Sequence, residues 1–165
     1  MTAEITIRKA GLKDAQTIAA LVNRFHPHQA PLERIAVAER FSEVGFLLAE
    51  TGQKTVGMLG WQVENLVIRV MDFLLTPDMD KEVAGGALIE AMENEGEMLQ
   101  AEVVVLFLPP NPAQDLITYW ENFGYAKRPI ADLPKSWREV SYEWDDSATQ
   151  VMIKQLRENM IRRPM

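Results

Sequence analysis

One stretch decides the fold: Asp72-Phe73-Leu74-Leu75-Thr76-Pro77-Asp78-Met79-Asp80-Lys81-Glu82-Val83-Ala84-Gly85-Gly86-Ala87-Leu88-Ile89-Glu90-Ala91. Its apolar start predicts a strand that Pro77 ends, and a helix is expected from Asp80 to about Leu99. The N–H groups at such a helix N-terminus, backed by the helix dipole, form an anion site. The same residues also fit a capped turn with Asp80 as N-cap, so phosphate binding and simple capping stay open alternatives.

Upstream of this stretch, strand-like alternation and helical spacing follow one another. Short connections between the later strands predict antiparallel hairpins. The expected elements are a strand at 5–8, helices at 13–25 and 32–41, and strands at 45–50, 55–63 and 66–75.

Downstream, an apolar run at 103–108 predicts a central strand buried on both faces. Ser147 and Gln150 form a capping-box pattern ahead of an apolar stripe, which predicts a final amphipathic helix. The other expected elements are a helix at 113–123 that ends at Gly124, strands at 125–128 and 139–144, and the final helix at 147–163.

The order of these elements predicts an α/β (α+β) fold with one mixed, mostly antiparallel central sheet flanked by helices. We expect one domain over residues 1–145 and a C-terminal amphipathic helical extension over 146–165. The basic edge of that extension would dock on its own domain or on a partner subunit, which leaves a homodimer open.

Composition narrows the function classes. The chain has 165 residues, 47% hydrophobic and 25% charged, as expected of a soluble globular domain. A net charge of -7 repels phosphate backbones and anionic lipids, so neither nucleic acid nor a membrane is expected as a partner. The lack of cysteine excludes thiol catalysis. No signal segment or membrane-length apolar run is present, so the expected location is cytoplasmic.

The element order and the stretch 72–91 resemble the GCN5-related N-acetyltransferases, the GNAT superfamily. That family places the acetyl-CoA pyrophosphate on an Arg/Gln-x-x-Gly-x-Gly/Ala loop, whose three motif positions fall on Asp80, Val83 and Gly85. Residues 118–125, Thr-Tyr-Trp-Glu-Asn-Phe-Gly-Tyr, are similar to the family's Phe-Tyr-Glu-x-x-Gly-Phe segment. The resemblance covers residues from about 4 to 145.

The resemblance implies an acyltransferase of the N-acetyltransferase type, with acetyl-CoA as co-substrate and no metal. An unidentified amine, on a small molecule or on a protein, would attack the thioester directly. The residues that the resemblance assigns to cofactor binding are Phe73, Leu74, Leu75, Lys81, Ala84, Gly85 and Gly86.

Three residues are candidates for proton transfer. Asp72 is the first candidate for the base, because it interrupts an apolar strand, although a strand residue on a solvated face is the alternative. Glu64 at the hairpin is the second candidate. Trp120 stands where the family often has a tyrosine that protonates the departing CoA thiolate. Tyr119 is the candidate for this acid here, and its hydroxyl lies one residue earlier, about 100° away around the helix. Arg69 would bind an acidic substrate or pair with Asp72.

Two loop histidines and an acidic segment complete the sequence-based hypotheses. His26 and His28 lie in a loop that often borders the acceptor site in this family. Three interpretations of these histidines stay open: they face the substrate, they chelate a metal, or they are exposed without a role. No cysteine or clustered carboxylate completes a metal site, so none is expected. Residues 78–102 carry the whole net charge of -7, and some of these acidic residues lie at the start of the expected helix. The alternative function is therefore a catalytically inactive GNAT-like binding or regulatory protein with weak or no CoA binding.

Overall fold

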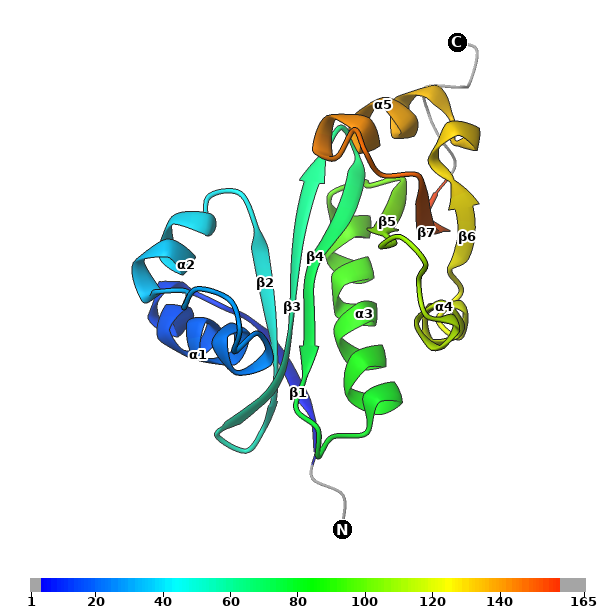
Figure 1. Cartoon of the computed structure of the whole chain (residues 1–165). Helices are drawn as coiled ribbons and strands as arrows, with labels where there is room; N and C mark the ends of the chain where they lie inside the picture. Colours follow the sequence, from blue (N-terminus) through cyan, green and yellow to red (C-terminus); the bar gives the residue numbers. More distant parts are fainter. Residues whose placement is uncertain (1–3, 158–165) are drawn as a thin grey trace. The chain divides into compact units, whose positions relative to one another are not determined.

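The computed structural model describes residues 4–157, which form a seven-stranded sheet and five α-helices (Figure 1). The strand order is β1-β2-β3-β4-β5-β7-β6. Only the β4–β5 pairing among the described ladders is parallel, which confirms the expected mixed, mostly antiparallel sheet. The elements are β1 (Thr6–Lys9), the 3-10 turn η1 (Leu12–Asp14), α1 (Ala15–Phe25), α2 (Arg34–Arg40), β2 (Gly45–Thr51), β3 (Lys54–Glu64), β4 (Val67–Leu75), α3 (Lys81–Met98), β5 (Val103–Phe107), α4 (Gln114–Glu121), β6 (Ala126–Pro129), the 3-10 turn η2 (Ile130–Asp132), α5 (Lys135–Trp144) and β7 (Gln150–Gln155).

The chain divides into two compact units. Among the described residues, the first comprises 4–62 together with 71–92, and the second comprises 63–70 together with 93–157. In the part of the chain that the structure describes, no helix combines the length and the apolar character that crossing a membrane requires.

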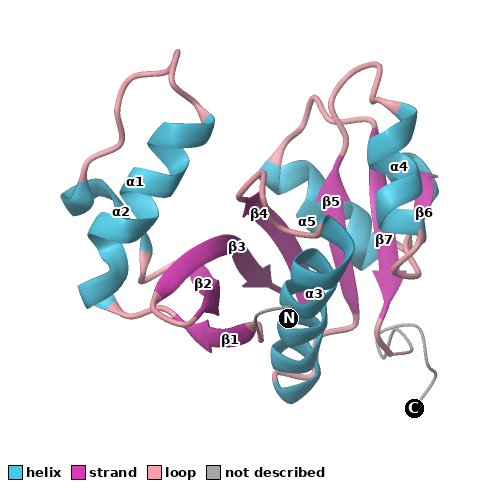
Figure 2. Ribbon diagram, turned by 90° about the horizontal axis from the view of Figure 1, so that it is seen from below, coloured by secondary structure: helices cyan, strands magenta, loops and turns pink. Residues whose placement is uncertain are grey.

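The first unit contains β1, β2 and β3 in antiparallel order, with α1 packed against α2 (Figure 2). Its core joins helix and strand side chains, because each amphipathic element must bury its apolar face against another. Ile18, Val37, Leu48 and Met58, one from each of α1, α2, β2 and β3, are all at most 1% exposed.

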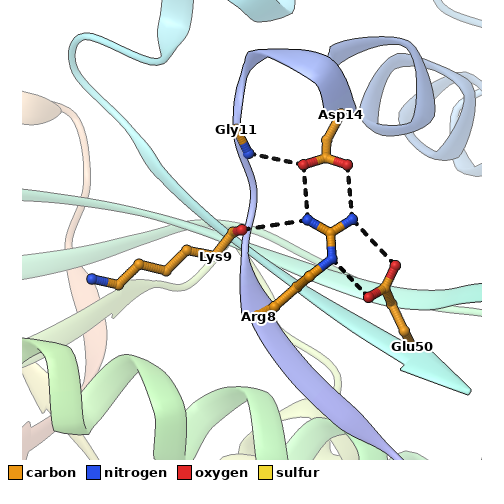
Figure 3. Close-up of polar contacts among 5 residues, drawn as sticks. All are labelled: Arg8, Lys9, Gly11, Asp14 and Glu50. Carbon is orange, nitrogen blue, oxygen red and sulfur yellow. Dashed lines mark hydrogen bonds and ion pairs between the residues drawn. The ribbon is translucent and has the colours of Figure 1, made fainter.

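Arg8 ties three segments of the first unit together (Figure 3). Its guanidinium donates two hydrogen bonds to the Asp14 carboxylate, at 2.8 and 2.9 Å, and its Nε donates to Glu50 Oε1 at 2.7 Å. The Gly11 N–H also donates to Asp14, at 2.8 Å. Hydrogen bonding from Arg8 lowers the pKa of Asp14 to about 2, because the charged carboxylate is the form that accepts these bonds. Strand β1, strand β2 and turn η1 are therefore held by one charged cluster.

The second unit is built on β5. This strand pairs in parallel with the first residues of β4, Val67–Arg69, and antiparallel with β7, which in turn pairs with β6. Strand side chains such as Val105 pack against Ile130 and against Trp137 of α5. Glu102 is fully buried, and the Trp137 indole N–H donates to its carboxylate at 2.9 Å.

The expected C-terminal helix at 147–163 is wrong over Gln150–Gln155, which form strand β7. This strand lies between β5 and β6, so both of its edges are hydrogen-bonded, and Val151 and Met152 are fully buried. The helical extension over 146–165 is thus replaced there by a strand of the sheet. Ser147 caps nothing and instead donates its hydroxyl to Asp145, at 2.7 Å. Residues 158–163 of the expected helix lie outside the described residues.

The expected strand at 139–144 is also wrong, because Lys135–Trp144 form helix α5. Trp137, Val140 and Ser141 are buried at helical spacing, and Pro134 precedes the first turn, where a proline is tolerated. The remaining expected elements are confirmed, with small shifts of their ends.

Candidate functional site

The connection from β4 to α3 begins at Leu75 and opens the helix at Lys81. Asp80 caps this helix: its Oδ1 accepts hydrogen bonds from the N–H groups of Glu82, at 2.9 Å, and Val83, at 3.2 Å. Its backbone carbonyl accepts from the Ala84 N–H, at 2.9 Å. The capped turn, one of the two alternatives that the sequence left open, is therefore what the structure contains.

This cap bears directly on anion binding. The first N–H groups of a helix are the ones that lack intrahelical partners and can face a phosphate. Two of them, at Glu82 and Val83, already face the carboxylate of Asp80. Gly85 and Gly86 lie inside α3, where backbone N–H groups belong to the helical ladder. A pyrophosphate bound here would have to displace Asp80 or lie beside it.

The other residues expected to bind the cofactor lie at the end of β4 and in the first turns of α3. Phe73, Leu74 and Leu75 are half-buried, and they come after Arg69, the last β4 residue in the ladder with β5. Lys81 is exposed, whereas Ala84 is fully buried. Their cofactor-binding roles, and those of Gly85 and Gly86, stay predictions.

A cavity of about 280 Å³ opens in the first unit, among α1, α2 and β4. It contains Asp72, the first candidate for the base, together with one of the two loop histidines, His26. The residues that line it are Val22, Asn23, His26, Gln29, Ala30, Leu32, Arg40 and Asp72.

The loop beside this cavity is held by Asn23 of α1. Its side-chain amide donates to the Leu32 carbonyl at 2.8 Å, and its side-chain oxygen accepts from the Leu32 N–H at 2.7 Å. Both ends of the Asn23 side chain therefore bond to one residue at the far end of the loop. The sequence-based reasoning missed Asn23, although an asparagine ahead of a loop with two prolines is a signal that could have identified it.

Asp72 lies in a partly buried environment rather than on a fully solvated face. Burial raises the pKa of the Asp72 carboxyl, while the positive charges of Arg40 and His26 act in the opposite direction. A Cβ atom on Gly60 of β3 would come within 3.2 Å of Asp72 Oδ2, so glycine leaves room for the carboxylate. The structure thus brings together the predicted base, a predicted histidine and Arg40, which the sequence did not single out.

The other candidates for the base and the acidic-substrate site lie elsewhere. Glu64 is exposed at the end of β3 and is not among the residues that line the cavity. The Arg69 guanidinium lies 4.6 Å from the centre of the Phe107 ring and 5.9 Å from that of Trp144. Burial lowers the pKa of Arg69, and the charge of Asp145 opposes that effect. Arg69 thus contacts aromatic rings.

The aromatic segment at the end of α4 belongs mainly to the core of the second unit. Trp120 is 2% exposed and packs edge-to-face on Tyr125, with ring centres 5.0 Å apart. Tyr119 is half-buried and contacts Phe123 in the same manner, at 5.1 Å. The role of Tyr119 as a proton donor stays a prediction.

A polar cluster that the sequence-based reasoning missed lies beside these rings. The Tyr125 hydroxyl donates to Glu93 Oε2 at 2.8 Å, and the Lys154 ammonium contacts Glu93 Oε1 at 3.0 Å. Lys154 also donates to the Phe123 carbonyl at 3.1 Å. Burial, with the Glu93 charge adding to it, raises the pKa of Tyr125 above its ordinary value, so this phenol stays protonated. Lys154 was expected on the basic edge of a helix and lies on β7 instead.

Comparisons with known proteins bear on the fold. No protein-family model matches the chain, and no curated protein matches it. N-acetylglutamate synthase from Neisseria gonorrhoeae, solved with coenzyme A and N-acetyl-glutamate, is similar at 15% identity and a TM-score of 0.69, over 96% of this chain and 36% of that one. This chain therefore spans about a third of the synthase.

Two further solved structures are similar over nearly their whole length. The PaiA N-acetyltransferase from Thermoplasma acidophilum, in complex with coenzyme A, has 13% identity and a TM-score of 0.67 over 92% of this chain and 99% of that one. An acetyltransferase of the GNAT family from Staphylococcus aureus Mu50 has 14% identity and a TM-score of 0.70, over 93% and 100%. The mixed α/β architecture is that of an acyltransferase fold. More particularly, the chain has the fold of the GCN5-related N-acetyltransferases.

Proposed function

We propose that the protein is an acyl-CoA-dependent N-acyltransferase, which moves an acetyl group from acetyl-CoA to an amine bound in the Asp72 cavity. The observation that carries this proposal is the position of Asp72, a partly buried carboxylate that lines a cavity immediately before Phe73–Leu75 of β4. Proteins of similar fold have been solved with coenzyme A or with acetyl-CoA, which supports this class of co-substrate. The amine belongs to a small molecule or to a protein, as the sequence predicted.

In the proposed reaction, the amine nitrogen attacks the thioester carbon. A C–N bond forms, the C–S bond breaks, and its electron pair leaves with the sulfur of CoA. Asp72 accepts the proton that the amine loses, directly or through a water molecule. A backbone N–H of Phe73–Leu75 would stabilise the negative charge on the carbonyl oxygen. Tyr119 remains the predicted proton donor to the thiolate, and Glu64 the second candidate for the base.

A second function is favoured by the cap on α3. Because the Asp80 carboxylate bonds the N–H groups of Glu82 and Val83, the protein carries its own anion where a phosphate would bind. A GNAT-like binding or regulatory protein that has little or no affinity for CoA would have this feature. The cytoplasmic location and a homodimer stay predictions under either function.

Thermal unfolding with acetyl-CoA separates the two functions. A ligand that binds only the folded state raises its melting temperature, so the enzyme predicts an increase that grows with acetyl-CoA concentration. No increase at millimolar acetyl-CoA would refute the acyltransferase and leave the regulatory protein.

The role of Asp72 is tested by release of the CoA thiol with a panel of amines. Asp72→Asn should lose turnover, because an amide cannot accept the proton. Glu64→Gln tests the second candidate for the base, and Glu90→Gln, on the exposed face of α3, is the matched control. Asp72→Asn should also be more stable to urea at neutral pH, since burial disfavours the ionised carboxylate that the variant lacks. Unchanged turnover in Asp72→Asn would remove Asp72 from the mechanism.

A further inference from the structure

The Asp72 cavity contains charges of opposite sign that do not pair with one another. The Asp72 carboxylate comes from β4, the Arg40 guanidinium from the last residue of α2, and the His26 imidazole from the C-cap of α1. All three line the same cavity of about 280 Å³. Within residues 4–157, none of these three side chains forms a hydrogen bond with another side chain, nor an ion pair within 4.0 Å.

This separation is informative because Arg40 and Asp72 are close enough to interact. Both residues line the same cavity, and the positive charge of Arg40 opposes the rise that burial causes in the pKa of Asp72. An arginine and a carboxylate in direct contact form a strong, often bidentate pair. Here each group instead keeps its hydrogen-bonding capacity, and the space between them can hold a ligand that satisfies both.

The remaining lining describes the rest of the ligand. Val22, Ala30 and Leu32 contribute apolar surface, so part of the cavity fits an uncharged aliphatic group. The hydrogen bonds between Asn23 and Leu32 hold the loop in place, so ligand binding loses little free energy to ordering of the loop.

We propose that this cavity binds a free α-amino acid, with its ammonium group toward Asp72 and its carboxylate group toward Arg40. Each charge of the ligand then meets the opposite charge of the protein, and the apolar lining faces the side chain. As the acceptor of an acetyl group this ligand rests on the proposed function, but its binding is measured without any CoA.

Isothermal titration of the whole chain with each of the twenty standard L-amino acids, in the absence of CoA, tests the proposal. At least one of them should bind. Its amide, which lacks the carboxylate, and its N-acetyl derivative, which lacks the ammonium, should each bind about ten-fold more weakly or worse, because each leaves one charged group unpaired.

Variants of two arginines in the same helix supply the control. Arg40→Met should weaken binding of the amino acid by about ten-fold or more, and Arg40→Lys by less, since lysine keeps the charge but not the fork of donors. Arg34→Met, at the exposed start of α2 and outside the cavity lining, should leave the affinity unchanged.

Three results would overturn the proposal: no binding by any amino acid, equal binding of the amide and the free acid, or equal affinity in Arg40→Met and Arg34→Met. Failure of the proposed function has a different signature, which is amino-acid binding without any stabilisation by acetyl-CoA. The two ideas therefore fail separately.

Discussion

Replacing Asp80 should reveal whether the cap of α3 controls binding of CoA. The Asp80 carboxylate bonds two N–H groups of the first helical turn, at 2.9 and 3.2 Å. Asp80→Ala removes both bonds and should lower the free energy of unfolding by about 1 kcal/mol, the usual cost of losing an N-cap. Asp80→Asn keeps an oxygen that can cap the helix and removes only the charge. It should therefore lower the free energy of unfolding by only about 0.3 kcal/mol.

Affinity for acetyl-CoA should change in the opposite direction. If a phosphate lay beside the Asp80 carboxylate at about 5 Å, two unit charges would repel by about 0.8 kcal/mol in water. Two pyrophosphate charges give about 1.6 kcal/mol, which corresponds to a little over a ten-fold change in affinity. At physiological salt, where the Debye length of about 8 Å roughly halves this repulsion, Asp80→Asn should bind acetyl-CoA about four-fold more tightly than the wild type, and Asp80→Ala at least as tightly as Asp80→Asn.

Isothermal titration with acetyl-CoA and urea denaturation, on the same preparations, measure the two effects. Glu90→Gln is the matched control: it makes the same charge change on the exposed face of α3, ten residues and about 15 Å further along the helix. At physiological salt that distance exceeds the Debye length, so its effect on affinity should be less than two-fold. Equal affinities in wild type and Asp80→Asn, or equal gains in Asp80→Asn and Glu90→Gln, would refute the reasoning.

Two further predictions concern stability. Because the folded protein, chiefly through hydrogen bonds from Arg8, holds the pKa of Asp14 at about 2, against an ordinary value of 3.8, the ionised Asp14 should contribute about 2 kcal/mol above pH 4 and lose it as the pH falls toward 2. Asp14→Asn should accordingly be less stable to urea by about 2 kcal/mol at pH 7, and a difference that persists undiminished at pH 2 would contradict this explanation. Tyr125→Phe removes the buried donor to Glu93 and should lower the free energy of unfolding by about 1 to 2 kcal/mol, measured by the same method; an unchanged value would mean that this hydrogen bond contributes nothing net.

Local signals accounted for the β4–α3 segment. Pro77 ends the strand, and Asp80 bonds to residues two and three positions ahead of it, so both effects act over one turn of chain. The helix was predicted from its spacing, and its observed start differs from the expected one by a single residue. Val83 is 58% exposed despite its apolar side chain, since it belongs to the N-terminal turn beside the cap.

The two errors of secondary structure arose where local preferences were ambiguous. Val151, Met152 and Ile153 fit an apolar helical stripe as well as a buried strand. The segment forms a strand because it pairs with β5 on one side and with β6 on the other. Strand β5 is distant in the sequence, and α5 separates β6 from β7. Trp137 was overlooked as the first buried residue of a helix because its partner, Glu102, is 35 residues away.

The sequence by itself determined the order of most elements, Asp80 as a candidate N-cap of the helix that follows β4, and the candidacy of Asp72, since each depends on neighbours within one or two turns of chain. It also placed His26 in the loop that borders the cavity. Tertiary structure alone decided that Arg40 and Asp72 line one cavity without pairing, because the core that joins α1 and α2 to the strands of the first unit brings residues 32 positions apart to the same space. Only the tertiary structure brings the Lys154 ammonium to the Glu93 carboxylate, because Lys154 lies on β7, which pairs with β5 in the sheet. Long-range packing and strand pairing carry the physical information that local periodicity lacks.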